Sequence, residues 1–92
     1  MNFKDKLEYY TEAEFLAFLE NIFTTHNHLT AEEFELFVRK HVKHFEKITE
    51  HPEKSDVIFY PKEGQEDSPQ GVLKEIKEWR AANGKPGFKS KD

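Results

Sequence analysis

The chain contains no cysteine among its 92 residues. This absence excludes a disulfide framework, a thiolate zinc site and a cysteine nucleophile, and it suits folding in a reducing cytosol. The chain also has no apolar run that approaches the length of a membrane span, and its opening residues, Met-Asn-Phe-Lys-Asp-Lys, lack the apolar core of a signal peptide. We therefore expect neither secretion by a signal peptide nor a membrane partner.

Catalytic signatures are equally scarce, since the sequence has no Ser/His/Asp order, no glycine-rich phosphate loop and no His-Glu-x-x-His motif. His26-Asn27-His28 spells the letters of the HNH nuclease signature, but that signature places its residues far apart in the sequence. His41 and His44 could face one cation, yet a third ligand is missing. We expect instead that His44 packs at a helix edge and that His41 occupies a partly hydrated boundary position. No catalytic residue, metal site or cofactor is predicted.

Charge is distributed unevenly along the chain. Residues 1–79 carry 17 acidic against 10 basic residues, whereas residues 80–92 carry 4 basic residues against 1 acidic residue. An acidic body repels phosphate, which argues against direct nucleic-acid binding, and it attracts a basic protein at low salt. The simpler alternative is that the acids only form a solvated surface.

Two capping boxes predict the starts of two helices. The first box, at residues 11–14, precedes an apolar run at helical spacing that reaches Phe23. Residues 24–29 break this periodicity. The second box, at residues 30–33, precedes a longer helical run that ends near Glu50.

A further helix is predicted after Ser68 and Pro69, and it ends at Asn83-Gly84. Residues 84–92 predict a loosely held basic tail. No stretch alternates apolar and polar residues long enough to make a strand, so residues 1–92 predict one all-α domain, a small distorted four-helix bundle with a very short third helix. The expected core residues are Phe15, Leu19, Ile22, Val42, Phe45, Ile48, Ile76 and Trp79.

The segment between Pro52 and Pro61 has room for little more than one helical turn. Pro52 marks the end of the preceding helix, and Pro61 disfavours helix at the residue before it. Residues 55–60, Ser-Asp-Val-Ile-Phe-Tyr, place an acid and two aromatic rings in this short space. Rigid aromatics beside a carboxylate have the composition of an interface hot spot.

The alternative for this segment is that its apolar residues fill the bottom of a small core and only Tyr60 is exposed. We expect a mixture of the two arrangements. Val57 and Ile58 should point inward, Phe59 should be partly exposed, and Tyr60 should be largely exposed. On this expectation some aromatic surface is left for a partner to cover.

Longer strings of residues stand out along the chain: Tyr-Thr-Glu-Ala-Glu-Phe-Leu at 10–16, Ile-Thr-Glu-His-Pro at 48–52, Ser-Asp-Val-Ile-Phe-Tyr-Pro at 55–61, Asp-Ser-Pro at 67–69 with Gly71, and Lys-Glu-Trp-Arg-Ala-Ala-Asn-Gly-Lys-Pro-Gly-Phe-Lys at 77–89. Together, and in this order, they resemble the immunity proteins of DNase-type colicins and S-type pyocins over most of the chain. The resemblance implies a four-helix fold with a very short third helix. It also implies a protein that inhibits the nuclease domain of its own producer's toxin.

The partner implied by the resemblance is the nuclease domain, a DNase, of the cognate bacteriocin in a one-to-one heterodimer. Inhibition is then exerted at an exosite beside the active site, so that DNA is excluded by bulk and by negative charge. The implied location is the bacterial cytoplasm, or release together with the toxin as a complex. Neither a nucleic acid nor a membrane is expected as a partner.

The resemblance also assigns roles to residues. In the family, the short third helix supplies shared binding energy through an Asp and two consecutive aromatics, which correspond to Asp56, Phe59 and Tyr60. With the flanking Ser55 and Pro61, these are called the anchor residues below. The family's second helix supplies the variable surface that selects the toxin. Its match predicts six specificity residues: Glu35, Val38, Arg39, Val42, Lys43 and Glu46.

Two positions depart from the family pattern. Phe59 stands where a second tyrosine is common, so any hydrogen bond from that hydroxyl is absent. His41 stands where an apolar core residue is usual. Residues 24–30 and the first half of the second helix match the family poorly, as expected of a region that diversifies to suit one toxin.

Two other classes of function are considered from the residues alone, without the resemblance. An acidic helical adaptor, or a DNA-mimicking inhibitor of another basic protein, would share the charge and the fold. An enzyme would need a bound metal or a pocket with strongly shifted pKa values. A neighbouring gene for a basic nuclease toxin would favour the immunity protein over both.

Overall fold

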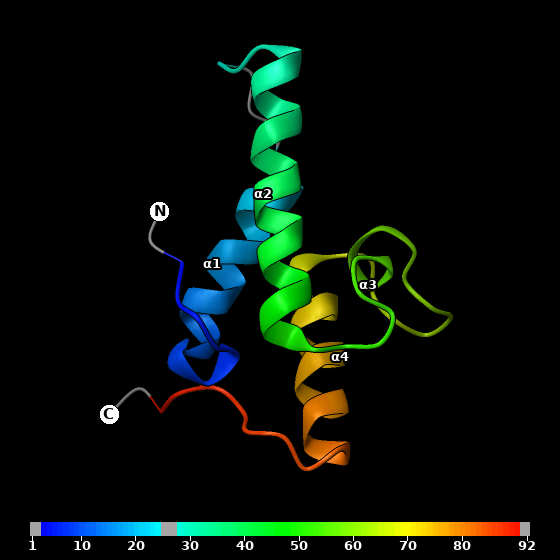
Figure 1. Cartoon of the computed structure of the whole chain (residues 1–92). Helices are drawn as coiled ribbons and strands as arrows, with labels where there is room; N and C mark the ends of the chain where they lie inside the picture. Colours follow the sequence, from blue (N-terminus) through cyan, green and yellow to red (C-terminus); the bar gives the residue numbers. More distant parts are fainter. Residues whose placement is uncertain (1–2, 25–27, 91–92) are drawn as a thin grey trace.

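Residues 3–24 and 28–90, which the computed structural model describes, form four α-helices and one short 3-10 helix (Figure 1). The elements are η1 (Leu7–Tyr9), α1 (Glu12–Phe23), α2 (Ala31–Thr49), α3 (Asp56–Phe59) and α4 (Pro69–Ala82). These residues contain no strand, so the predicted all-α fold with a very short third helix is confirmed. The predicted break at 24–29 and the His26-Asn27-His28 string both include residues that lie outside the described part.

Side-chain caps begin α1, α2 and α4 where the sequence predicts them. Thr11 and Thr30 each accept a hydrogen bond at 3.1 Å from the backbone N–H three residues later, and the glutamate there accepts one at 2.9 Å from the threonine N–H. At α4 the hydroxyl of Ser68 accepts from the Gly71 N–H, with Pro69 in the first turn. These caps satisfy N–H groups that have no partner inside the helix, and so they fix where each helix begins.

The helices form a distorted bundle. α1 packs against α4 and α2, and α3 packs against α4. Figure 1 shows the first half of α2 extending beyond the other helices, and the chain after α4 turning back beneath η1 and α1. None of the helices in the described part combines the length and the apolar character that a membrane span requires.

The core contains most of the residues predicted for it. Val42 and Trp79 are corrections, because both are only half-buried. Val42 lies on the outer side of α2 near Phe59, and the Trp79 ring lies 4.9 Å from the ring of His51. The predicted core residues that are buried are Phe15, Leu19, Ile22, Phe45, Ile48 and Ile76. The further buried apolar residues are Leu7, Tyr10, Phe18, Val57, Ile58 and Val72.

The two histidines of α2 lie side by side but differ in burial. His41 is buried, so the predicted hydrated boundary position is wrong. Its ring centroid lies 4.0 Å from that of Phe37 and 5.6 Å from that of Phe18, and its Nδ1–H donates to the Phe37 carbonyl oxygen at 2.8 Å. His44 is half-buried at the helix edge, as predicted, and stacks on Phe3 at 4.3 Å. The ring of Phe3 also lies 5.0 Å from the His41 ring, which explains why His41 is shielded from water.

Residues 84–90 are attached to the body at several points, which differs from the expected loosely held tail. The Lys89 N–H donates to the carbonyl oxygen of Tyr10 at 2.7 Å. The ring of Phe88 packs against the core, with its centroid 5.2 Å from that of Phe15. Packing of this partly buried ring on the core, together with the backbone hydrogen bond of Lys89, opposes the entropy lost by ordering the segment, which its basic composition alone does not predict.

A buried arginine joins the end of α2 to this segment. The Arg80 guanidinium donates to the carbonyl oxygen of Thr49 at 3.0 Å and, through Nε, to that of Pro86 at 2.7 Å. It also pairs with Glu50 at 3.3 Å. Hydrogen bonding from Arg80, followed by the charge of Lys85, lowers the pKa of Glu50. Arg80 thus supplies donors to the end of α2, whose last carbonyl groups have no partner inside the helix.

Candidate functional site

The short α3 turn directs two aromatic side chains outward. Val57 and Ile58 are buried, whereas Phe59 is 49% exposed and Tyr60 is 75% exposed. The mixed arrangement expected from the sequence is confirmed. Large exposed rings next to a carboxylate, here that of Asp56, are the type of group that dominates the energy of many protein interfaces.

Backbone hydrogen bonds fix the turn that carries the anchor residues. The carbonyl oxygen of Ser55 accepts from the Phe59 N–H at 3.0 Å, and that of Asp56 accepts from the Tyr60 N–H at 2.8 Å. Pro61 disfavours helix at the residue before it, so the turn ends at Tyr60. Ser55 and Pro61 are half-buried, whereas Asp56 is exposed. The first two therefore frame the turn, and the exposed surface comes from the other three.

A carboxylate on α4 holds both flanks of this turn. Oε2 of Glu75 lies 3.0 Å from Nε2 of His51, which precedes the turn, and Oε1 lies 2.8 Å from Nζ of Lys62, which follows it. Burial raises the pKa of Glu75, but the hydrogen bonds from Lys62 and His51 and the charge of Lys62 outweigh burial, so the pKa lies below its ordinary value. Gln65 adds a contact by donating from Nε2 to the Val57 carbonyl oxygen at 2.9 Å.

The predicted surface on α2 forms a groove that continues onto α3. Its volume is about 400 Å³, and its walls are mainly apolar. Glu35 and Arg39 form an ion pair of 2.8 Å, with both side chains exposed to solvent. The structure therefore brings four of the specificity residues together with one anchor residue. The lining residues are Phe34, Glu35, Val38, Arg39, Val42 and Phe59.

The other two specificity residues do not line this groove. Lys43 is exposed and follows Val42 by one position, about 100° around the helix. Glu46 is half-buried and lies about one turn beyond Val42. Tyr60 also lies outside the lining, although it directly follows Phe59 in the chain. Lys43, Glu46 and Tyr60 are therefore close in sequence to residues that line the groove, but they do not contribute to its walls.

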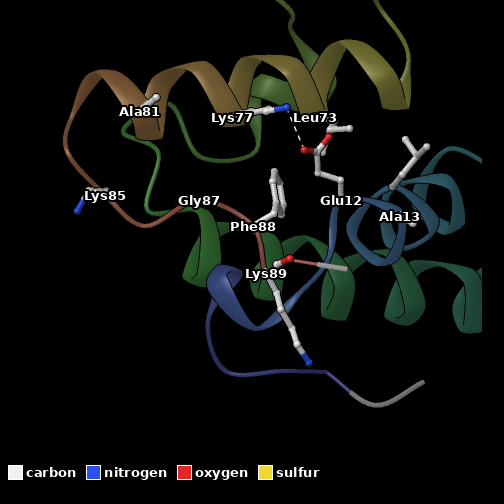
Figure 2. A pocket seen from close by; sticks show the side chains of 11 residues that line it. Glu12, Ala13, Leu73, Lys77, Ala81, Lys85, Gly87, Phe88 and Lys89 are labelled. Atoms are coloured by element: carbon white, nitrogen blue, oxygen red, sulfur yellow. Dashed lines mark hydrogen bonds and ion pairs between the residues drawn. The ribbon is translucent and has the colours of Figure 1, made fainter. Parts of the chain in front are cut away.

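A larger groove, of about 770 Å³, lies between α1, α4 and the end of the chain (Figure 2). In Figure 2 the ring of Phe88 stands between the two helices, and Lys77 reaches across to Glu12, 2.9 Å away. None of the anchor or specificity residues lines this groove. Within residues 3–24 and 28–90, no group of three or more His, Asp or Glu side chains is arranged to hold a metal ion.

The sequence did not indicate the residues that support α3. Glu75 lies 24 positions from His51, and Gln65 lies 8 positions from Val57, so no local pattern links these pairs. The available signal is helical phase. Glu75 lies one turn before Trp79, so both face the same side of α4, where the His51 ring packs.

Comparisons with known proteins give consistent relatives for this chain. The family model described as colicin immunity protein / pyocin immunity protein matches residues 7–82. The pyocin-S1 immunity protein of Pseudomonas aeruginosa is 50% identical over 88 residues, which cover 95% of this chain and 98% of that protein. The pyocin-S2 immunity protein of P. aeruginosa PAO1 is 49% identical over 88 residues, with the same coverage.

Solved structures give the same result at the level of the fold. The chain superimposes on a chain of the crystal structure of the pyocin AP41 DNase–immunity complex with a TM-score of 0.87 and 53% identity, covering 95% of this chain and 99% of that one. It also matches the structure of a mutant nuclease domain of pyocin S8 with its cognate immunity protein. That match has a TM-score of 0.71 and 45% identity, and covers 95% of this chain and 100% of the other.

Proposed function

The chain belongs to the colicin and pyocin immunity proteins, and from this membership we propose that it binds and inhibits the nuclease domain of a cognate bacteriocin. The proposed partner is a DNase domain of the pyocin type, bound one-to-one. The chain has no reaction of its own under this proposal. It acts in the cytoplasm of the producing bacterium and leaves the cell with the toxin.

The observation that carries the proposal is the exposed pair Phe59 and Tyr60, held beside the groove of α2. An exposed aromatic pair on a fixed turn supplies a large contact area with little loss of side-chain freedom. Asp56, on the same turn, supplies a charge for a basic partner. We assign shared affinity to the anchor residues and toxin selection to the specificity residues.

The inhibitor binds beside the nuclease active site and does not fill it. A DNase must present a basic surface to the phosphates of DNA, and an acidic protein docked next to that surface repels the substrate while blocking its path. The acidic excess of residues 1–79 supports this arrangement. Complexes between colicin DNases and their immunity proteins are among the tightest protein complexes known, so family membership alone leads us to expect tight binding.

The proposal is tested by titrating the protein into a panel of bacteriocin nuclease domains, including those of pyocins AP41 and S8, and following plasmid cleavage. For the cognate domain, cleavage should disappear at one molar equivalent. Undiminished cleavage by every domain at a tenfold excess of the protein would overturn the proposal. The matched comparison is the double variant Asp56→Ala and Tyr60→Ala, whose dissociation constant for the same domain should rise by about a thousandfold or more in a direct binding titration.

The position of the inhibitor is tested with two substrates. If the protein binds beside the active site, it should stop cleavage of plasmid DNA but leave hydrolysis of a small phosphodiester, such as bis(p-nitrophenyl) phosphate, largely unchanged. Equal inhibition of both substrates would show that the active site itself is filled. That result would contradict the exosite while leaving inhibition established.

A further inference from the structure

We propose that Glu75 is a positioning residue for the partner-binding turn. On this proposal its side chain does not touch the partner but holds Asp56, Phe59 and Tyr60 in the geometry that the partner recognises. The inference rests on the proposed function, because it assigns a role within the same binding site. It also makes a statement about the free protein, which is tested without any nuclease.

The geometry of Glu75 supports this role. Its two carboxylate oxygens bind different flanks of one chain segment, His51 on one side and Lys62 on the other. The side chain is only 12% exposed, and that of His51 only 4%, so the contact between them is shielded from solvent. Low exposure leaves little of the Glu75 carboxylate for a partner, and it strengthens the contact with His51 relative to a surface ion pair.

In the hydrogen bond between His51 and Glu75, the donor and the acceptor can be assigned. Nδ1 of His51 accepts a hydrogen bond from the Glu53 N–H at 3.1 Å, so the ring proton lies on Nε2 and is donated to Glu75. The same residue accepts through its carbonyl oxygen from the Lys54 N–H at 3.0 Å. Lys54 has a left-handed φ of 52°, a conformation that is unfavourable for a residue other than glycine and that the contact with the His51 carbonyl helps to hold. His51 therefore connects the entry of the α3 segment to α4.

The exit of the segment is held more weakly. Lys62 follows Pro61, and its side chain is 59% exposed. Hydrogen bonding to Glu75, followed by the charge of Glu75, raises the pKa of Lys62. Exposed ion pairs contribute little, so most of the positioning comes from His51, and Lys62 makes a smaller contribution in the same direction.

The α3 turn needs such support because it is too short to be stable alone. Four helical residues lie far below the length at which an isolated helix forms in water. Phe59 and Tyr60 are exposed, so the backbone of the turn decides where their rings point. Ordering this turn before binding removes an entropic cost that the complex would otherwise carry.

Amide hydrogen exchange in the free protein tests the positioning itself. Glu75→Gln keeps the size of the side chain, but its amide has one oxygen and can accept from only one of the two donors. Exchange at the Phe59 and Tyr60 amides should accelerate by about fivefold or more. The matched control is Glu12→Gln, which removes the same charge and breaks the Lys77 ion pair on another part of the surface. It should leave both amides unchanged.

Binding to the pyocin AP41 DNase domain, or to whichever panel domain the protein inhibits, then tests the consequence. Glu75→Gln should weaken affinity by about tenfold, and Glu12→Gln by less than twofold. In a background that lacks all three positioned side chains, with Asp56→Ala, Phe59→Ala and Tyr60→Ala combined, Glu75→Gln should weaken affinity by no more than about threefold, because nothing remains for it to position. An equal loss in both backgrounds would assign Glu75 a direct contact and overturn the proposal.

Lys62→Met provides a second variant that removes only the exposed contact and does not threaten folding. It should accelerate exchange at the Tyr60 amide by about twofold. Unchanged exchange in both Glu75→Gln and Lys62→Met, in proteins with native circular dichroism, would overturn the positioning role. A complete lack of binding by the unsubstituted protein would overturn the proposed function alone, since the exchange result is independent of it.

Discussion

Two adjacent aromatic residues, Phe59 and Tyr60, differ in how much of the ring is available to a partner. Tyr60 is 75% exposed, while about half of Phe59 is covered by its own protein. Tyr60→Ala should therefore weaken nuclease binding by about 2 kcal/mol or more, and Phe59→Ala by less. Asp56→Ala should cost about 2 kcal/mol as well, because a cation of the partner would lose its counter-charge. A binding titration of each variant measures these values.

Tyr9→Ala is the control for the aromatic substitutions. Tyr9 is 48% exposed but lies in η1, outside the anchor and specificity residues. Its replacement should leave affinity within about 0.5 kcal/mol of the original value. Full affinity in a folded Tyr60→Ala variant would remove Tyr60 from the binding surface.

His44 makes stability depend on pH. Burial lowers the pKa of His44, and a backbone hydrogen bond with Lys4 only partly opposes this. Its Nε2 lies 3.1 Å from the hydroxyl of Tyr10, a hydroxyl that also accepts from the Lys4 N–H. The unfolded chain binds a proton at this site at higher pH than the folded protein does. The stability supplied by neutral His44 is therefore present above about pH 6.5 and is lost as the pH falls through the folded-state pKa.

His44→Gln should flatten this dependence, because glutamine does not titrate and its oxygen can still accept from the Tyr10 hydroxyl. Urea unfolding at pH 7.5 and pH 5.5 gives the change in free energy of unfolding for each protein. The control is His28→Gln, which replaces an exposed histidine and should retain the decline of the original protein. An equal decline in the His44→Gln variant would assign the pH dependence to other groups.

At the scale of elements, α3 and α2 have different proposed roles, affinity for one and selection for the other. Val42 lines the groove beside Phe59, and Arg39 pairs with Glu35 on its rim. Arg39→Glu or Val42→Asn should therefore change the ratio of affinities for two related nuclease domains by more than Tyr60→Ala does, since selection depends on unfavourable as well as favourable contacts. If Tyr60→Ala changed the ratio and the α2 substitutions did not, this division would be wrong.

The start of α4 depends on a close approach between backbone segments. A Cβ atom added to Gly71 would collide with the carbonyl oxygen of Glu66, so the helix and the preceding loop fit only without a side chain there. Gly71→Ala should lower the free energy of unfolding by about 1–3 kcal/mol. Gly87→Ala, whose added Cβ would meet no atom within 4 Å, should be close to neutral in the same denaturant titration. Equal stability of both variants would contradict the close approach.

The elements that could be predicted are those specified by neighbours in the sequence. The caps at Thr11, Thr30 and Ser68 act over three residues, so the helix starts followed directly from local chemistry. Burial of His41 and half-exposure of Val42 depend on segments that lie far away in the sequence. The first is covered by Phe3, and the second is left at the edge of a groove.

In the candidate site, too, only the features that depend on sequence neighbours could be predicted. The outward direction of Phe59 and Tyr60 was predictable because Pro52 and Pro61 confine the segment to a single turn. The support from Glu75 was not, because its partners His51 and Lys62 come to it only through tertiary packing. The exposed rings of the candidate site could thus be predicted from local sequence, whereas the contacts that hold their turn depend on tertiary packing.

At the scale of the whole molecule, the uneven distribution of acidic and basic residues gives the two grooves different charges. Three lysines, Lys77, Lys85 and Lys89, line one groove together with Glu12, and only Lys77 reaches Glu12 there (Figure 2). The groove on α2 and α3 is lined by one acid and one base, Glu35 and Arg39, which pair with each other, and the exposed Asp56 lies on the adjoining turn. An approaching basic protein would therefore be attracted to the binding surface more than to the face where the lysines compensate the acids.

This asymmetry predicts how salt affects the rates of binding. Raising the NaCl concentration from about 25 mM to about 0.5 M should slow association with the nuclease domain by about tenfold or more, while the dissociation rate changes much less. Glu35→Gln should slow association at low salt, whereas Glu12→Gln, which lies among lysines, should change it by less than about twofold. Stopped-flow measurements at both salt concentrations give these rates. A salt effect confined to dissociation, or an equal effect of both substitutions, would show that the charge distribution does not guide the encounter.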